Sequence, residues 1–281
     1  MQTIRTIKKM QAVAKLLTVK KKKIGLVPTM GALHEGHLSL IRRAKKAADV
    51  VIVSVFVNPA QFGPKEDFKK YPRDEKEDLK KIKKAGGDIV FAPEAAEIYP
   101  CDYETYVVLE NLPKTLEGEI RPDHFRGVAT IVSKLFNITR PDLAVFGMKD
   151  YQQAMVIKKM TRDLGFPIRI IIAPTVREED GLAMSSRNRY FDHIGRWEAV
   201  CLFYALRTAR EMVKAGIVDT KLITKEMRAV ILATCAVAKI DYIAFTEFET
   251  LKPVKKVVKN TVCSLAVRLH GVRLIDNMKL I

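Results

Sequence analysis

The sequence lacks the cysteine pairs, long apolar runs and leader segment that characterise several protein classes. No two of its four cysteines form a CxxC pair, so neither a zinc site nor a redox pair is indicated. No stretch has the ~18 uncharged apolar residues of a membrane helix, and the N-terminus has no apolar signal region. We therefore expect a cytoplasmic protein with reduced thiols and no membrane partner.

Acidic residues are few: 32 Asp and Glu stand against 49 Lys and Arg, which gives a formal net charge of +17. Such a charge attracts nucleotides, nucleic acid or anionic lipid. No recognised nucleic-acid motif accompanies it, so solvated surface lysines are favoured over nucleic-acid binding. The first 34 residues contain no Asp or Glu, as a transit peptide also would, but they lack serine and run into a core strand.

Strand and helix patterns alternate over residues 1–175. Val50–Val57 is a nearly continuous β-branched run, typical of a parallel strand covered on both faces. Helical patterns cover Thr3–Leu17 and Asp74–Ala85, and the second ends at Gly86-Gly87. This α/β alternation predicts a Rossmann-like parallel sheet domain, although no GxGxxG follows the first strand.

The pattern changes after Pro174. Helical stretches at about Arg196–Ala215 and Leu222–Cys235 precede three strand-like ones, at Ile240–Phe245, Val262–Leu269 and Val272–Ile275. We interpret residues 176–281 as a smaller α+β domain.

The most specific motif is His34-Glu35-Gly36-His37, which follows the first buried strand. Its two imidazoles lie three residues apart at a predicted helix start, where free N–H groups and Gly36 suit phosphate. Both rings can donate hydrogen bonds to the charge that develops at an α-phosphorus. The spacing is not that of HExxH, but metal ligation and purely structural histidines stay open as alternatives.

A second phosphate-binding candidate is Met184-Ser185-Ser186-Arg187, which taken alone would equally suit an ordinary loop. Lys149 can neutralise phosphate, and Asp150 can accept a hydrogen bond from a ribose hydroxyl. The alternative interpretation is that Asp150 caps a helix and Lys149 is an ordinary solvated lysine.

Neutral amides and carboxylates complete the candidate groups. Gln61 and Gln153 follow two different strands and can hold hydroxyls and a carboxylate, although a lone glutamine is usually a surface residue. Because open parallel sheets bind ligands at the carboxyl ends of their strands, we expect the polar groups that follow these strands to converge on one edge of the sheet. Glu77 and Asp78 are candidates for a place near Mg²⁺, but a solvated helix face is the favoured interpretation. No metal ligand is assigned.

Several longer blocks resemble the pantothenate synthetases, the pantoate–β-alanine ligase family of HxGH nucleotidyltransferases. They are PTMGALHEGHLSLI, FVNPAQFGP, RPDHFRGVAT, PDLAVFGMKDYQQ, VREEDGLAMSSRN and RLIDN. The resemblance covers nearly the whole chain and is strongest over residues 24–190. Asp123 and His270 stand where it leads us to expect glycine.

The resemblance implies an ATP-dependent ligase that joins pantoate to β-alanine through pantoyl adenylate, with Mg²⁺ accompanying ATP. It implies catalytic roles for His34, His37, Lys149 and Arg187, and substrate contacts for Gln61, Gln153 and Asn58. The residues implied to bind ATP are Met30, Gly31, His34, Gly36, His37, Gly147, Met148, Lys149, Asp150, Val176, Met184, Ser185, Ser186 and Arg187. A homodimer, and a C-terminal domain that closes as a lid over ATP, are also implied.

Two other classes of function stay open on the sequence. The first is another nucleotidyl-transferring enzyme, such as a tRNA synthetase fragment, although roughly 105 residues leave little room for a tRNA-binding domain. The second is a basic RNA- or membrane-surface-binding protein, whose RNA retention would be salt-sensitive.

Overall fold

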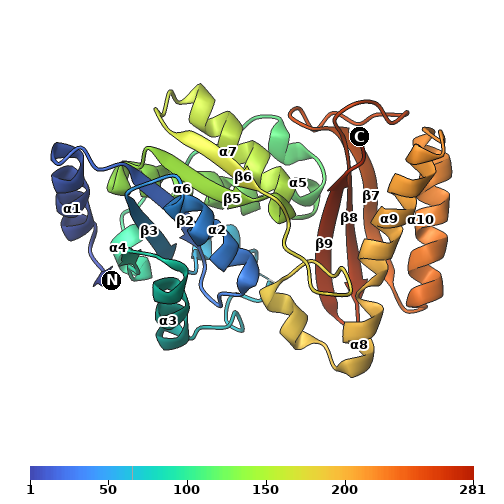
Figure 1. The fold of residues 1–281 in the computed structure, drawn as a ribbon, viewed down its shortest axis with the longest axis horizontal. Helices are drawn as coiled ribbons and strands as arrows, with labels where there is room; N and C mark the ends of the chain where they lie inside the picture. Colours follow the sequence, from blue (N-terminus) through green and yellow to red (C-terminus); the bar gives the residue numbers. More distant parts are fainter. Residues whose placement is uncertain (65) are drawn as a thin grey trace. The chain divides into compact units, whose positions relative to one another are not determined.

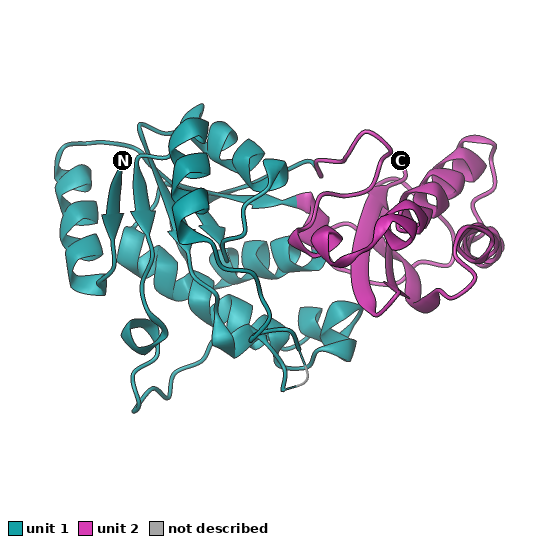
Figure 2. Ribbon diagram, turned by 90° about the horizontal axis from the view of Figure 1, so that it is seen from below, with its two compact units in different colours: residues 1–147, 152–174 teal, residues 148–151, 175–281 magenta. Residues whose placement is uncertain are grey.

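The computed structural model describes residues 1–64 and 66–281, which divide into two compact units (Figure 2). Unit 1 comprises Met1–Gly147 with Gln152–Pro174, and unit 2 comprises Met148–Tyr151 with Thr175–Ile281. The short segment Met148–Tyr151 therefore groups with the later part of the chain. In the part of the chain that the structure describes, no helix has the length and apolar character needed to cross a bilayer.

Unit 1 is built on a parallel sheet, to which the described residues contribute six strands in the order β1-β4-β3-β2-β5-β6. Figure 1 labels β2, β3, β5 and β6 of this sheet. They are β1 (Gln2–Ile4), β2 (Ile24–Thr29), β3 (Val50–Val55), β4 (Ile89–Phe91), β5 (Leu143–Gly147) and β6 (Arg169–Ala173). The order reverses direction between β2 and β5, and sheets of this kind bind ligands beyond the strand ends at such a point. The predicted Rossmann-like architecture is confirmed.

Helices cover both faces of this sheet. On one face, α1 (Ile7–Val19), α6 (His124–Thr139) and α7 (Tyr151–Asp163) share a buried cluster with Ile52 of β3. On the other face, α2 (Glu35–Lys45) and α3 (Glu75–Ala85) pack with Val51 and Val53. Successive β3 side chains thus enter opposite cores, which explains the continuous apolar run. The shorter helices are η1 (Pro59–Gln61), α4 (Ala95–Ile98), η2 (Leu112–Lys114) and α5 (Glu117–Ile120).

Unit 2 contains an antiparallel sheet in the order β7-β8-β9, which confirms the predicted α+β character. Its strands are β7 (Lys239–Glu247), β8 (Thr261–Leu269) and β9 (Val272–Lys279). Leu206 of α9 (Cys201–Lys214) and Ile223 and Met227 of α10 (Thr220–Thr234) pack into one core with Leu265 of β8. The unit's shorter helices are η3 (Met148–Asp150), η4 (Ser186–Tyr190) and α8 (His193–Glu198).

Two helix predictions need correction. The helix predicted over Thr3–Leu17 begins only at Ile7, because Gln2–Ile4 is an edge strand paired with β4. A strand of three residues has too little alternation to be recognised in the sequence. The single helix predicted over Arg196–Ala215 is two helices, and the first begins earlier because Asp192 caps it by accepting from Gly195 N.

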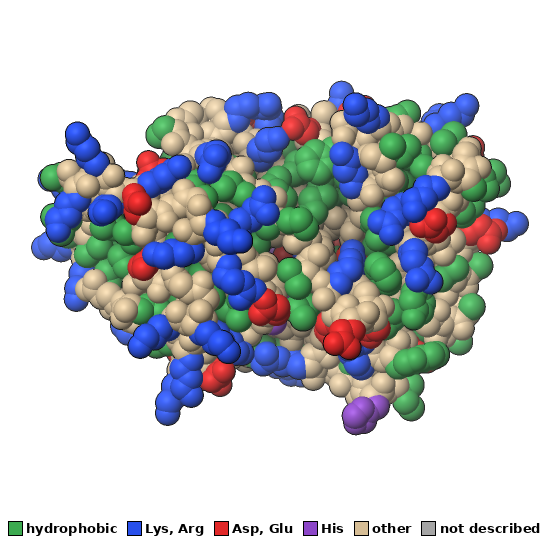
Figure 3. All heavy atoms as spheres, in the orientation of Figure 1, with side chains coloured by type: hydrophobic (Ala, Val, Ile, Leu, Met, Phe, Trp, Pro, Cys, Tyr) green, Lys and Arg blue, Asp and Glu red, His purple; other side chains and the backbone are tan. Residues whose placement is uncertain are grey.

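The positive charge is not gathered into one patch on the face of the molecule that Figure 3 shows. On the face drawn in Figure 3, Lys and Arg side chains lie scattered among apolar and neutral groups, with acidic groups between them. Such a distribution is typical of solvated surface lysines, which gain little from fixed partners.

Candidate active site

The HxGH segment, His34–His37, follows β2 through a loop that is fixed by hydrogen bonds. Gly31 and Ala32 have φ of +82° and +52°, so the chain passes through the left-handed region before α2 begins. The Thr29 hydroxyl accepts from Gly31 N at 3.2 Å. Asp78 of α3 accepts from the backbone N–H groups of Ala32 and Leu33, both at 2.8 Å. The loop is therefore fixed by a buried carboxylate and by its own strand.

The two histidines stand side by side at the start of α2. His34 is the N-cap residue, and its ring centroid lies 4.1 Å from that of His37. The backbone N–H of His34 donates to His37 Nδ1 at 3.4 Å, which places the proton of a neutral His37 ring on Nε2. Both rings are half-buried. Among the described residues, neither belongs to a cluster of three potential metal ligands.

Asp78 corrects one sequence interpretation. Its side chain does not lie on a solvated helix face: it is 3% exposed, and each of its oxygens accepts a backbone N–H. Glu77, one residue earlier, has a side chain that is 45% exposed and lies 3.7 Å from Lys80. The two neighbouring acids therefore differ, because one helical position faces the HxGH loop and the other faces solvent.

We expect Asp78→Asn to lower the free energy of unfolding by about 1–3 kcal/mol, since the amide nitrogen cannot accept from a backbone N–H. Turnover should fall with it, because the loop that carries the histidines loses one support. Urea unfolding and steady-state assays measure both effects. Glu77→Gln is the matched control and should leave both unchanged. Equal stability of the two variants would show that Asp78 does not hold the loop.

Gln61 lies beside the HxGH loop within unit 1. Its Nε2 donates to Met30 Sδ at 3.0 Å, and its Oε1 accepts from Asn58 Nδ2 at 3.1 Å. Asn58 is 1% exposed and also donates to Gly127 O and accepts from the Tyr99 hydroxyl. The ends of β2 and β3 thus converge as predicted from the sheet. Asn58 holds the Gln61 amide, and protein groups occupy its own hydrogen-bonding atoms.

The backbone carbonyl of Gln61 accepts hydrogen bonds from residues for which the sequence predicted no role. His124 Nδ1 lies 2.9 Å from Gln61 O, and Arg121 donates to the same oxygen at 3.4 Å. Arg121 is itself held by Glu66 through two contacts of 2.6 Å. Because a carbonyl only accepts, His124 carries its proton on Nδ1. The block RPDHFRGVAT contained these residues, but nothing in it indicates contact with Gln61, which lies 63 residues earlier.

A pH effect follows from this arrangement. Desolvation and the neighbouring Arg121 guanidinium lower the pKa of His124 to about 4, although Gln61 O, Glu66 and Glu117 act in the opposite direction. Below about pH 6.5 the unfolded chain binds a proton that the folded chain does not. The free energy of unfolding is therefore unaffected by His124 above pH ~6.5. It falls by up to about 3 kcal/mol as the pH approaches 4, because the unfolded chain then binds a proton at His124.

Urea unfolding at several pH values tests this expectation. His124→Gln removes the titrating group, so its stability should depend less steeply on pH between about 4 and 6.5 than that of the wild-type chain. His193→Gln, at an exposed position, is the control and should keep the wild-type slope. Identical slopes for all three proteins would show that His124 does not contribute.

The two adjacent glutamines of α7 differ in environment. Gln152 is 4% exposed and its amide is fully engaged: it donates to Leu112 O and Thr115 O and accepts from Glu117 N. Gln153 is half-buried. Gln152, for which no substrate role was predicted, therefore holds the neighbouring backbone, and the substrate role predicted for Gln153 stays a hypothesis.

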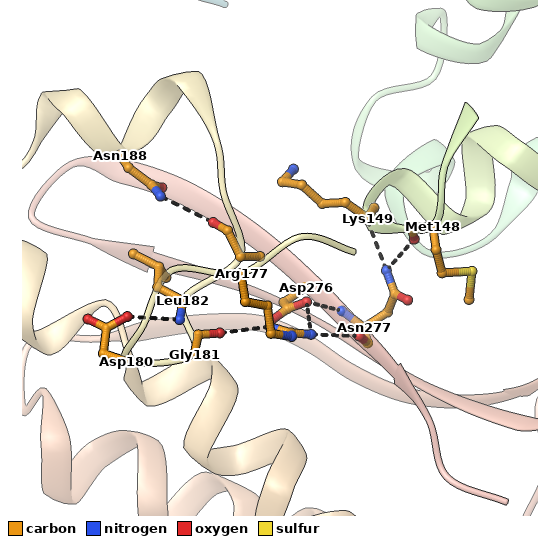
Figure 4. Close-up of polar contacts among 10 residues, drawn as sticks. Met148, Lys149, Arg177, Asp180, Gly181, Leu182, Asn188, Asp276 and Asn277 are labelled. Atoms are coloured by element: carbon orange, nitrogen blue, oxygen red, sulfur yellow. Dashed lines mark hydrogen bonds and ion pairs between the residues drawn. The ribbon is translucent and has the colours of Figure 1, made fainter. Parts of the chain in front are cut away.

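Unit 2 carries the remaining candidate groups, and the first cluster is at η3. Lys149 Nζ lies 3.4 Å from Asp150 Oδ1. The backbone carbonyls of Met148 and Lys149 both accept from Asn277 Nδ2 at 2.9 Å (Figure 4). A side chain of β9 thus holds the short helix that presents Lys149.

The adjacent residue, Asp276, anchors the loop that leads to Met184–Arg187. Asp276 is 3% exposed and forms a bidentate pair with Arg177, at 2.6 and 3.0 Å (Figure 4). Arg177 also donates to Gly181 O at 3.0 Å, inside the same loop. Asp276 and Asn277 therefore fix both groups of candidate ATP-binding residues in unit 2.

The Ser185–Arg187 segment forms local hydrogen bonds of its own. Ser185 is the N-cap of η4 and its hydroxyl accepts from Arg187 N at 3.3 Å. Met184 N donates to Val176 O at 3.0 Å, which closes the preceding loop. The side chains of Ser185, Ser186 and Arg187 are half-buried.

The candidate residues are thus divided between the units. Unit 1 holds Gln153 and Gly147, and it brings together Met30, Gly31, His34, Gly36, His37, Asn58 and Gln61. Unit 2 brings together Met148, Lys149 and Asp150 at η3 and organises Val176 and Met184–Arg187 in one loop.

Comparison with known proteins shows which family the chain resembles. Residues 2–279 match the family model described as pantoate-beta-alanine ligase. A pantothenate synthetase of Moorella thermoacetica is 54% identical over 257 residues, which cover 92% of this chain and 90% of the relative. One of Thermosipho melanesiensis is 48% identical over 278 residues, or 99% of each chain.

Solved structures of similar proteins have the same fold. The pantothenate synthetase of Thermus thermophilus matches with a TM-score of 0.94 and 42% identity, covering 100% of this chain and 99% of that one. A pantoate-beta-alanine ligase of Francisella tularensis, solved with beta-gamma ATP and beta-alanine, matches with a TM-score of 0.83 and 35% identity over 99% and 97%. The chain belongs to the pantoate–β-alanine ligase family of enzymes.

Proposed function

We propose that the chain joins pantoate to β-alanine in two half-reactions. The pantoate carboxylate attacks the α-phosphorus of ATP, which forms pantoyl adenylate and releases pyrophosphate. The β-alanine amine then attacks the acyl carbon, forms the amide bond and expels AMP. Neither step needs a side-chain nucleophile, so the protein acts by positioning two anions and by stabilising the charge that develops between them.

The observation that carries this proposal is the imidazole pair at the N-terminus of α2. With Nδ1 of His37 accepting from His34 N, the His37 Nε2–H is the donor suited to an α-phosphate oxygen. The helix N-terminus adds N–H groups and partial positive charge, which favour a phosphate at the same place. His34, 4.1 Å away between ring centroids, supplies a second ring for the same charge.

The groups of unit 2 are proposed to bind the rest of ATP. Lys149 and Arg187 balance phosphate charge, Asp150 accepts from a ribose hydroxyl, and the Ser185 and Ser186 hydroxyls donate to phosphate oxygens. Mg²⁺ arrives with the triphosphate as part of the substrate and neutralises its oxygens. The similar Francisella ligase, solved with beta-gamma ATP and beta-alanine, supports these ligands for this chain.

Gln61 and Gln153 are proposed to bind pantoate. An amide offers donors to a carboxylate and acceptors to hydroxyls without a charge that would reduce the carboxylate's nucleophilicity. Asn58 holds the side-chain amide of Gln61, and His124 holds its backbone carbonyl. These two contacts reduce the conformational entropy that Gln61 loses when a ligand binds. Asn58 therefore acts by orienting Gln61.

Pyrophosphate exchange is the test of this function. Labelled pyrophosphate should enter ATP when pantoate is present and β-alanine is absent, since the first half-reaction is reversible. Amino acids should not replace pantoate. Exchange that follows an amino acid, or that needs no acid at all, would favour another nucleotidyl-transferring enzyme. Salt-sensitive RNA retention without exchange would favour the RNA-binding alternative.

We further propose that unit 2 closes over bound ATP through the Ser185–Arg187 segment. Trypsin cleavage after Arg187 and Arg189 should then become several-fold slower when ATP and pantoate are added, because a ligand that binds the folded segment suppresses its opening. Cleavage at the exposed residues Lys20–Lys23 provides an internal control and should not change. Equal cleavage after Arg187 with and without ligands would contradict the closure.

The homodimer is likewise a proposal that rests on the family resemblance. Light scattering on the eluate of a sizing column should give about twice the chain mass of 31.8 kDa. A mass equal to one chain would contradict it.

A further inference from the structure

Three side chains of unit 2 form a cluster outside the residues assigned to ATP or pantoate. They are Glu198 at the end of α8, Cys235 at the C-cap of α10, and His270 in the turn between β8 and β9. One donor atom from each lies within 4.8 Å of the other two. The cluster could not be recognised in the sequence, because its members lie far apart in the chain and form no CxxC or His-pair motif.

The contacts within the cluster involve the atoms that ligate metals. His270 Nε2 lies 2.5 Å from Glu198 Oε2, and the Cys235 thiol donates a hydrogen bond to the same carboxylate. Tetrahedral zinc with bonds of about 2.0–2.3 Å spaces its ligand atoms by about 3.3–3.8 Å. The imidazole and the carboxylate would have to separate by roughly 1 Å to admit the ion.

The imidazole and the carboxylate lie on the exposed side of the cluster, where they can separate and where an ion can reach them from solvent. Cys235 is buried, whereas the His270 side chain is 36% exposed and that of Glu198 is 19% exposed. The exposed side of the cluster leaves room for water as a fourth ligand. His270 lies on the two-residue turn between β8 and β9, outside both strands of the sheet.

The backbone at His270 is unusual for a histidine. Its φ is +47°, and that of Gly271 is +78°. Hairpin turns of this kind favour Asn-Gly or Gly-Gly, because a side chain is strained in the left-handed region. The imidazole therefore stands at a position where the turn itself prefers a smaller residue, and its contact with Glu198 compensates for that strain.

We propose that unit 2 binds one zinc ion through Cys235, His270 and Glu198. A thiolate, an imidazole and a carboxylate form a donor set that zinc accepts and that magnesium, with its preference for oxygen ligands, does not. Binding displaces the thiol proton to solvent. The ion cross-links the ends of two helices to a hairpin turn, so its role is to stabilise unit 2.

The test uses the full chain, stripped with a chelator and titrated with Zn²⁺, and with Co²⁺ as a spectroscopic probe. We expect one Zn²⁺ per chain and, with Co²⁺, a thiolate-to-metal charge-transfer absorption that Cys235→Ser abolishes. His270→Gly should weaken Zn²⁺ binding at least tenfold and still fold, because glycine suits the turn. Zn²⁺ at about 100 times the wild-type dissociation constant should raise the melting temperature of the wild-type chain by roughly 5 °C, and that of Cys235→Ser and His270→Gly by clearly less.

Matched controls separate this site from adventitious binding. Cys101→Ser and His193→Gln change an exposed thiol and an exposed imidazole outside the cluster, so both should bind Zn²⁺ as the wild-type chain does. The proposal is overturned if the stripped chain binds no Zn²⁺, or if Cys235→Ser and His270→Gly bind it as tightly as these controls. In that case the cluster is a set of hydrogen bonds among an imidazole, a carboxylate and a thiol.

Discussion

Replacing His37 by alanine should lower turnover by about 10²–10³-fold, the effect of removing one donor to a charge that develops in the transition state. The melting temperature should change by less than about 2 °C, because the ring is half-buried and its hydrogen bond with His34 N is long, at 3.4 Å. Steady-state kinetics and thermal unfolding on the same preparation measure both quantities.

His193→Ala is the matched control, since His193 is the exposed first residue of another helix. It should leave turnover unchanged. Pyrophosphate exchange should fall in His37→Ala as steeply as the complete reaction, because the donor acts in the adenylation step. A variant that unfolds early but turns over normally would make His37 a structural residue.

Removing the Asp276 carboxylate should have the largest effect on stability. Asp276→Ala leaves Arg177 without its bidentate partner in a largely buried place, and breaking such a pair costs about 3–5 kcal/mol. The loop from Val176 to Arg187 loses its anchor, so the KM for ATP should rise more than the KM for pantoate. Asp276→Asn keeps the shape and one acceptor and should have a smaller effect.

Asp241 offers a control of the same chemistry in the same sheet. It pairs with Arg268 and Arg273 at 3.0 and 2.6 Å, but these contacts join strands of the sheet and involve no candidate ATP-binding loop. Asp241→Ala should therefore destabilise the chain and leave the KM for ATP unchanged. If the Asp241 and Asp276 variants raised that KM equally, Asp276 would have no special role in positioning the loop.

The sequence predicted those features that depend on local pattern. The β-branched run at Val50–Val57 indicated a strand covered on both faces, and Gly86 indicated the end of α3, where the structure has φ of +96°. The sheet rule that places strand ends at one edge predicted the convergence of the β2 and β3 loops, and the contact between Gln61 and Met30 confirms it.

The supporting contacts were not predictable, because they join residues far apart in the chain. Arg177 and Asp276 lie 99 residues apart, and Asn277 reaches the carbonyl of Met148 across 129 residues. Asp78 shows the same limit on a helix: acids at neighbouring positions look alike in sequence, and only the packing of α3 against the HxGH loop buries one of them. Sequence motifs thus identified the groups that we propose to act on the substrates. The residues that hold these groups in place could be found only from the tertiary packing.

In the proposed reaction, the pantoate carboxylate attacks the α-phosphorus of ATP. Pantoate labelled with ¹⁸O in both carboxylate oxygens tests it in one turnover with ATP and β-alanine, followed by mass spectrometry of the nucleotide and the amide product. We expect AMP that carries one ¹⁸O in its phosphate, with the other ¹⁸O in the amide carbonyl of the product. Unlabelled AMP, or ADP with the label in inorganic phosphate, would contradict it.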